Sequence, residues 1–158
     1  MVRRSPGRHE FGTIIERYTV PGLVISLFDF TTTMVGPWAK AGHRCYCVDS
    51  QHPKGETEEG NVVKVGADVR EWVPPMGAGV SFVAAFPPCT HLATSGARWF
   101  KGKGLYALAE SIELFARAAA VCEASGAPYL IENPMGTIST YWRKPDFKFH
   151  PHEYGGWA

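Results

Sequence analysis

Residues 80–90 read VSFVAAFPPCT, an apolar run that two prolines end. The β-branched and aromatic residues of this run predict a buried strand over Val80–Phe86. Proline donates no hydrogen bond to a strand ladder, so Pro87 and Pro88 end the strand and deliver Cys89 to a tight loop beyond it. Ligands bind at that carboxyl edge in open α/β sheets. We therefore interpret Cys89 as a nucleophile, although free cysteines are also often buried core residues.

The rest of the chain alternates between strand and helix patterns. Further strands are expected over residues 24–28, 44–49, 62–65 and 129–131, and helices over residues 34–41 and 105–125, each helix followed by a glycine. The polar segment Gln51–Asn61 is interpreted as a loop. Strands that alternate with helices favour parallel pairing through right-handed crossovers. The predicted fold class is α/β, with a mostly parallel, Rossmann-like sheet and flanking helices.

Length and composition suit one globular domain. The chain has 158 residues, of which 45% are hydrophobic and 20% charged, and its net charge is +1. A charge this small gives no global nucleic-acid signal, so any such surface must be a local patch. No apolar run approaches the roughly 20 residues of a membrane helix, and no signal peptide is evident. We expect a cytoplasmic protein without membrane contact.

The cysteine and histidine spacings predict no metal site. The four cysteines match neither a disulfide framework nor a zinc motif, so reduced thiols are expected. His150 and His152 flank Pro151 and are a possible pair of metal ligands, but nothing nearby in the sequence completes a ligand set.

Three acidic residues follow predicted strands in the same way as Cys89. Asp49 ends the second strand, about 20 residues beyond the first, which is the distance at which an acid binds ribose hydroxyls in nucleotide-binding folds. Asp68 follows the strand over residues 62–65, and Glu132 follows the last one. If the sheet is parallel, all four side chains face one crevice. Each acid alone is also an ordinary turn or capping residue.

The chain resembles the C5-cytosine DNA methyltransferases, especially a compact phage- and prophage-type branch, from about Leu23 to Pro134. The likeness is carried by Ile25-Ser26-Leu27-Phe28 with Ala41-Gly42, by Gly66-Ala67-Asp68, by Pro88-Cys89-Thr90 with Ser95-Gly96 and Gly104-Leu105, and by Glu132-Asn133-Pro134. The resemblance implies a class I S-adenosylmethionine-dependent methyltransferase fold. It divides the chain into an N-terminal extension (1–20), a methyltransferase-like core (21–135) and an irregular aromatic and basic tail (136–158).

The resemblance also implies an activity, methyl transfer from S-adenosylmethionine to C5 of cytosine in DNA. The Cys89 thiolate would add to C6 of a flipped-out cytosine, which makes C5 nucleophilic. Glu132 would hold a proton at N3 of the base. Pro88 and Asn133 belong to the same catalytic set.

The resemblance assigns the cofactor site as well. Asp49 would bind the ribose hydroxyls and Asp68 the adenine amine. Phe28, Asp29 and Phe86 would complete the cofactor site. Phe28 and also Trp72 could pack against the adenine, although filling the core is the more common use of either aromatic.

Two features depart from the family pattern. The family's first motif is glycine-rich after the phenylalanine, whereas this chain has the bulkier residues Asp29–Thr33. The family also places an arginine-bearing motif, a target-recognition region and two further strands after Glu-Asn-Val, whereas this chain ends at Ala158. We therefore expect an exposed sheet edge and an incomplete cofactor wall. A homodimer or a complementing C-terminal fragment would supply what is missing.

Arg98, Arg143 and Lys144 are candidates for contacts with phosphate or cytosine O2. Residues 141–144 interleave aromatic and basic side chains, as nucleic-acid surfaces often do, although a solvated tail shows the same pattern. Three alternatives stay open: a catalytically silent or half-enzyme binding module of the same fold, another modification at C5 of a pyrimidine, and a free pyrimidine nucleotide as the substrate.

Overall fold

The computed structural model describes residues 21–75, 79–94, 100–150 and 153. The chain divides into two compact units. The first, here called the sheet unit, contains Met1–Pro88 and Glu113–Glu132. The second, here called the loop unit, contains Cys89–Ile112 and Asn133–Ala158. The predicted extension over residues 1–20 and the candidate Arg98 lie outside the described residues.

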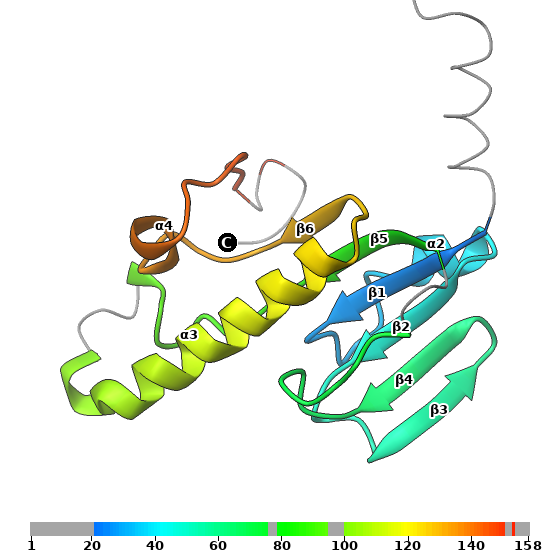
Figure 1. The fold of residues 1–158 in the computed structure, drawn as a ribbon, viewed down its shortest axis with the longest axis horizontal. Coiled ribbons are helices and arrows are strands. Elements are labelled where there is room, and N and C mark those ends of the chain that lie inside the picture. Colours follow the sequence, from blue (N-terminus) through cyan, green and yellow to red (C-terminus); the bar gives the residue numbers. More distant parts are fainter. Residues whose placement is uncertain (1–20, 76–78, 95–99, 151–152, 154–158) are drawn as a thin grey trace, which may run out of the picture. The chain divides into compact units, whose positions relative to one another are not determined.

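A six-stranded sheet with the order β3-β4-β2-β1-β5-β6 forms the centre of the sheet unit (Figure 1). The strands are β1 (Leu23–Leu27), β2 (Arg44–Val48), β3 (Gly55–Glu59), β4 (Val62–Gly66), β5 (Val80–Ala85) and β6 (Tyr129–Ile131). All neighbouring strands pair in parallel except β3, which is antiparallel to β4. The predicted α/β class with a mostly parallel sheet is confirmed, and the strand order is compatible with a Rossmann-like fold.

Strand β3 is the element that the sequence did not predict, and the expected loop over Gln51–Asn61 is wrong for this part. All five residues of β3 are exposed, so the strand lacks the apolar alternation by which half-buried strands are found. It forms through its hairpin with β4 and through ion pairs of Glu58 with Arg44 and of Glu59 with Lys64. These contacts involve partners on other strands, which a pattern within residues 51–61 does not contain.

The two predicted helices are present with shifted ends. They are α2 (Gly36–Lys40), shorter than expected, and α3 (Phe100–Ala124), which begins at Phe100 rather than Leu105 and is interrupted at Gly104. Gly42 and Gly126 follow the helices with φ of +93° and +64°, the left-handed conformation common after a helix end. The tail contains one further short helix, α4 (Ile138–Tyr141). None of the described helices is both long and apolar enough to span a bilayer.

The core of the sheet unit lies on both faces of the sheet. On one face, Ile25 and Val83 belong to a buried cluster with Ala118 and Val121 of α3. On the other face, Val24, Cys45 and Cys47 pack with the α2 region, where the Trp38 ring stacks on Phe82 at 5.2 Å. Because right-handed crossovers on opposite faces lead away from β1 and β5 in opposite directions, the strand order reverses between these two strands.

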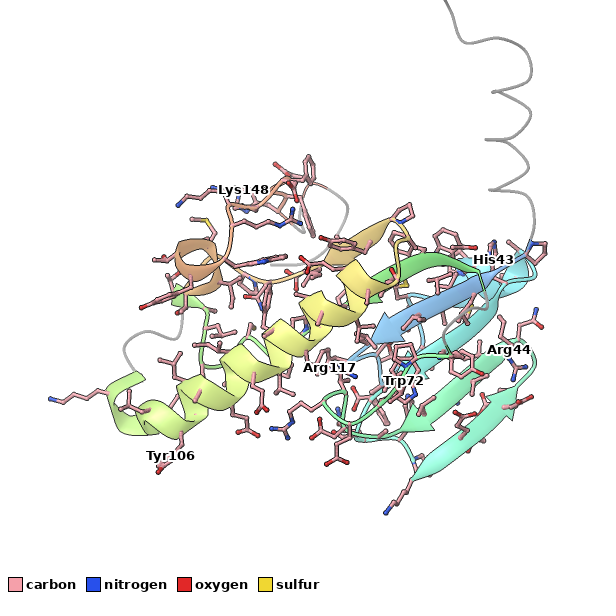
Figure 2. The ribbon with its side chains drawn as sticks, viewed as in Figure 1. His43, Arg44, Trp72, Tyr106, Arg117 and Lys148 are labelled. Atoms are coloured by element: carbon pink, nitrogen blue, oxygen red, sulfur yellow. The ribbon has the colours of Figure 1, made fainter. Side chains whose placement is uncertain are left out.

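Trp72 fills the core rather than lining a ligand site. Its side chain is buried in the cluster beneath α3. Arg117 of α3 fixes the backbone around it, because the guanidinium donates to the carbonyl oxygens of Val69 at 3.2 Å and Trp72 at 2.8 Å (Figure 2). This contact ties the segment after β4 to α3.

Candidate functional site

The reversal of strand order places a candidate ligand site at the carboxyl ends of β1 and β5. The backbone N–H of Phe86 donates to the Leu27 carbonyl at 3.1 Å, so the two strands stay together to the point where they end. Asp29 follows β1, and Pro87 and Pro88 follow β5. Ligands of open α/β sheets bind at such a reversal, outside the strand ends.

Asp29 organises the loop after β1. Its Oδ1 accepts hydrogen bonds from the Thr32 backbone N–H at 2.8 Å and the Thr31 hydroxyl at 3.2 Å. Its Oδ2 accepts from the Ser26 hydroxyl at 2.9 Å. The carboxylate is buried and joins this loop to the end of β1, and the Cys47 thiol of β2 also lies 4.0 Å from Oδ2.

The same loop holds two residues in a conformation that favours glycine. Phe28 and Thr32 both have φ of +59°. For a residue with a side chain this region costs about 1–3 kcal/mol, and such strain concentrates at functional sites. Phe28 is partly buried and packs against the core cluster beneath α3, as its core-filling alternative predicts. The strain lies beside the reversal of strand order, which supports this edge as the candidate site.

Asp49 and Asp68 lie at the same carboxyl edge, after β2 and β4. Asp49 is buried, and its Oδ1 accepts the Gln51 backbone N–H at 2.8 Å. Among the described residues no partner binds its Oδ2. Asp49 therefore combines a turn contact with an acceptor that remains open to a ligand.

Arg70 engages the Asp68 carboxylate, a contact that the sequence analysis did not find. Its Nε lies 3.0 Å from both Asp68 oxygens, and its guanidinium also reaches Glu113 of α3 at 3.3 Å. Arg70 holds the pKa of Asp68 below its usual value. The Asp-Val-Arg spacing over residues 68–70 was a usable signal. A ligand that needs the Asp68 oxygens has to compete with this ion pair.

Glu132 follows β6, the strand beside β5. Its backbone N–H donates to the Ala85 carbonyl at 3.0 Å, so it leaves the sheet next to the point where β5 ends. Its side chain is half-buried, and burial raises the pKa of the carboxyl above the usual value. A carboxyl with a raised pKa keeps its proton to higher pH, which suits a group that must share a proton with a substrate.

Cys89 begins the loop unit in a tight turn. Its carbonyl oxygen accepts the backbone N–H groups of Leu92 and Ala93, both at 2.9 Å. The next carbonyl, that of Thr90, accepts a hydrogen bond from Lys103 of α3 at 2.8 Å. The turn around the thiol is thus fixed through its backbone from two sides.

The segment after Cys89 pairs with the segment after Asn133. Ala93 and Gly136 form an antiparallel bridge, and the Thr137 N–H donates to the Leu92 carbonyl at 3.0 Å. The family resemblance implies one catalytic set that contains Cys89 and Asn133, and within the loop unit the segments that follow these two residues pair with each other.

Asn133 is the clearest unsatisfied polar group in the loop unit. Both Oδ1 and Nδ2 of its amide are buried without a hydrogen-bond partner in the described part of the chain. Leaving a buried polar group unpaired costs about 1–3 kcal/mol, so such a group calls for a partner. The amide of Asn133 offers a donor and an acceptor to a ligand.

Gly136 is required where the two segments meet. A Cβ at this position would lie 1.9 Å from the backbone oxygen of Leu92. We expect Gly136→Ala to lower the free energy of unfolding by at least about 2 kcal/mol, because backbone must move to relieve the clash. Gly102→Ala in α3 is the matched control, since its Cβ would meet no atom within 4 Å. Urea denaturation of both variants checks this, and equal stabilities would contradict it.

A cavity of about 360 Å³ lies within the loop unit. Its polar lining is His91, Lys101, Lys103 and Thr137, and the residues around the break in α3 complete it. The Nδ1 atom of His91 is buried without a hydrogen-bond partner among the described residues. Two ammonium groups and an imidazole give this cavity a preference for anionic groups.

The four thiols differ in accessibility. Cys45, Cys47 and Cys122 are buried, whereas Cys89 is partly exposed. Burial raises the pKa of Cys45 to about 11 and those of Cys47 and Cys122 to about 12. At pH 8 these three thiols are ionised to about one part in a thousand or less.

We therefore expect iodoacetamide to alkylate Cys89 at least about 100-fold faster than the other three thiols in the native chain. Peptide mass spectrometry over a time course checks this order. Denaturing the chain first is the control, because it should make the four rates similar. Faster native modification of any buried cysteine would contradict the expectation.

In the described part of the chain, no group of three or more His, Cys, Asp or Glu side chains is placed to hold a metal ion. His152, one of the two histidines considered above, lies outside that part. No protein-family model, curated protein or solved structure matches this chain.

Proposed function

We propose that this chain is a methyltransferase-type enzyme that acts at C5 of cytosine in DNA, with S-adenosylmethionine as the methyl donor. The observation that carries the proposal is the position of its two catalytic motifs. Pro88–Cys89 and Glu132–Asn133 follow the neighbouring parallel strands β5 and β6, beside the reversal of strand order. Within the loop unit, the segments that continue from these motifs pair with each other. The adjacency of the two motifs at the strand ends and the pairing of the segments that follow them are both expected if the motifs form one active site.

In this proposal the residues of the chain carry the base chemistry. The Cys89 thiolate forms a bond to C6 of cytosine, and the electron pair of the C5–C6 double bond becomes available at C5. Glu132, whose raised pKa favours its protonated form, shares that proton with N3 and limits the negative charge on the ring. After methylation, transfer of the C5 proton to water restores the double bond and expels the thiolate. Asn133 offers its unpaired amide to the base.

The cofactor site is supported unevenly. S-adenosylmethionine supplies an electrophilic methyl group when it is bound. The Oδ2 atom of Asp49 is open to accept hydrogen bonds from ribose hydroxyls. The loop over Phe28–Thr32, with its strained backbone, lies beside the strand reversal and could contact the cofactor through main-chain groups. Asp68 fits an adenine amine less well, because Arg70 already holds its oxygens.

The engaged Asp68 favours a second candidate function, a binding module of the same fold without turnover. In that case the carboxyl edge would bind a small molecule, and Cys89 would not form a covalent bond. The two functions differ in one measurable product, the covalent adduct.

The test is trapping with an oligonucleotide that carries 5-fluorocytosine, in the presence of S-adenosylmethionine. Fluorine replaces the proton that must leave C5, so the enzyme should remain covalently attached after methyl transfer. Denaturing mass spectrometry should show the chain plus the methylated oligonucleotide. Calorimetric cofactor binding without an adduct would overturn the enzyme and favour the binding module, and absence of both would overturn both functions.

A further inference from the structure

The segment Tyr141–Phe149 of the loop unit, here called the aromatic-basic tail, exposes large aromatic side chains in an unusual concentration. Tyr141 is 83% exposed and Phe147 is 71% exposed. Trp142 and Phe149 are 40% and 46% exposed. Isolated exposed apolar residues are normal on a protein surface, but contiguous ones mark interaction sites. The exposed rings of Tyr141 and Phe147 therefore make this segment a candidate interaction site.

The rings are arranged as planar surfaces. Phe147 and Phe149 stack with ring centroids 6.3 Å apart and an interplanar angle of 19°. The Arg143 guanidinium lies over the Trp142 ring, 4.6 Å from its centroid. Planar partners such as nucleobases stack on aromatic rings and on guanidinium groups alike.

The tail is also locally basic. The segment contains three basic residues, Arg143, Lys144 and Lys148, and one acidic residue. The acidic residue, Asp146, forms an ion pair with Arg143 at 3.2 Å. Lys144 and Lys148 are exposed, and Figure 2 shows the Lys148 side chain extending from the backbone. The chain as a whole has a net charge of only +1, whereas this segment alone carries a net charge of +2, from three basic residues and one acidic residue. An anionic occupant complements it.

The positive charge and the flat aromatic rings of the tail together indicate which kind of ligand it binds. A second copy of the same patch would bring Lys144 and Lys148 against like charges, which disfavours a symmetric contact. A nucleic-acid duplex presents phosphates but keeps its bases stacked on each other inside the helix. An unpaired strand presents both phosphates and free base faces, which match the cations and the rings.

We propose that the aromatic-basic tail binds unpaired DNA, with bases stacked on Tyr141 and Phe147 and phosphates contacted by Lys144 and Lys148. The choice of DNA rests on the proposed function, whereas the preference for an unpaired strand rests on the tail alone. The tail would tolerate many sequences, because every base has a face that can stack.

The experiment is fluorescence anisotropy of the full chain with a labelled oligothymidine of 20 nucleotides and with a duplex of the same length. We expect the single strand to bind more tightly. Tyr141→Ala and Phe147→Ala should each weaken its binding by about fivefold or more. Tyr106→Ala is the matched control, because Tyr106 lies in α3 of the same unit, is 94% exposed and is outside the tail (Figure 2).

The lysines are tested through the dependence on salt. Replacing Lys144 and Lys148 together by glutamine should reduce the slope of log affinity against log salt by about 1.4, which is about 0.7 for each lost phosphate contact with a single strand. The control exchanges the exposed Lys40 and Lys54 of the sheet unit in the same way and should leave the slope unchanged. Circular dichroism and thermal unfolding verify that all variants are folded.

Three results would overturn the inference: tail variants that bind like the wild type, a duplex bound as tightly as the single strand, or tail variants that change sedimentation without changing affinity. The last would show that another copy covers the tail. A chain that binds strands but forms no adduct refutes only the proposed enzyme, and normal adducts with unaffected tail variants refute only this inference.

Discussion

If the chain has the proposed activity, replacing Cys89 by serine should lower methyl transfer at least about 10⁴-fold, because a serine hydroxyl has almost no anionic form at neutral pH and does not add readily to C6. The adduct with 5-fluorocytosine should disappear as well. Transfer of a labelled methyl group to an oligonucleotide measures the rate. The thermal stability of this variant should stay close to that of the wild type, since Cys89 is partly exposed.

Cys122→Ala is the matched control for a structural thiol. Cys122 belongs to the buried cluster beneath α3, so its truncation removes packing. This variant should unfold at a lower temperature while its rate at permissive temperatures stays close to that of the wild type. The two cysteine variants thus separate chemistry from packing. Methyl transfer that persists in Cys89→Ser would exclude Cys89 as the nucleophile.

The second large effect is expected for Glu132→Gln, which should slow methyl transfer by about 10²- to 10⁴-fold, the usual contribution of a positioned acid or base. An amide cannot share a proton with N3 as a carboxylic acid does. The wild-type rate should fall as pH rises through the raised pKa of Glu132, and the residual rate of the variant should lack that decline. Rates measured between pH 5 and 9 check both parts.

The same substitution, Glu132→Gln, should raise the free energy of unfolding at high pH although it lowers the rate. Because burial raises the pKa of Glu132, the folded chain binds this proton more tightly than the unfolded chain does. The wild type therefore loses stability as pH rises from the unfolded pKa of a glutamate through the raised folded pKa. Glu132→Gln should be the more stable chain above that range, and the difference should vanish at lower pH.

The exposed Glu56 of β3 supplies the control for both measurements. Its conversion to glutamine removes the same charge from a surface strand. Glu56→Gln should change neither the rate of methyl transfer nor the dependence of stability on pH over the range in which Glu132 loses its proton. A Glu132→Gln variant that keeps full activity would show that Glu132 contacts no reacting base.

The apolar strands and the long helix could be predicted because their signals are local. Strands β1, β5 and β6 are short apolar runs with turn residues on both sides, and the apolar positions of α3 recur at steps of three and four residues. The prolines after β5 mark the end of that strand as clearly. Parallel pairing followed from the alternation of strands and helices, and with it the common edge for Asp49, Asp68 and Glu132.

The contacts of the candidate site were less predictable. The sequence predicts Asp29 as a cofactor residue, but its oxygens already accept hydrogen bonds from Ser26 of β1 and from the Thr32 backbone N–H. The expected adenine ligand Asp68 holds Arg70, and Arg70 reaches α3 through Glu113. An acidic residue after a predicted strand shows where a carboxylate lies, but it does not show which neighbouring group forms a hydrogen bond or ion pair with that carboxylate.

By itself the sequence determined the α/β class, the strands that end at the candidate site and the edge at which Glu132 lies, because each follows from hydrophobic periodicity and from prolines and glycines close along the chain. Only the tertiary structure decided that the polar β3 is a strand, that Phe28 and Thr32 adopt strained backbone, and that Gly136 packs against Leu92. Each of these features depends on a partner or on loop closure that no single segment encodes. Local patterns therefore predict the scaffold, and contacts between distant segments decide which groups at the site remain open to a ligand.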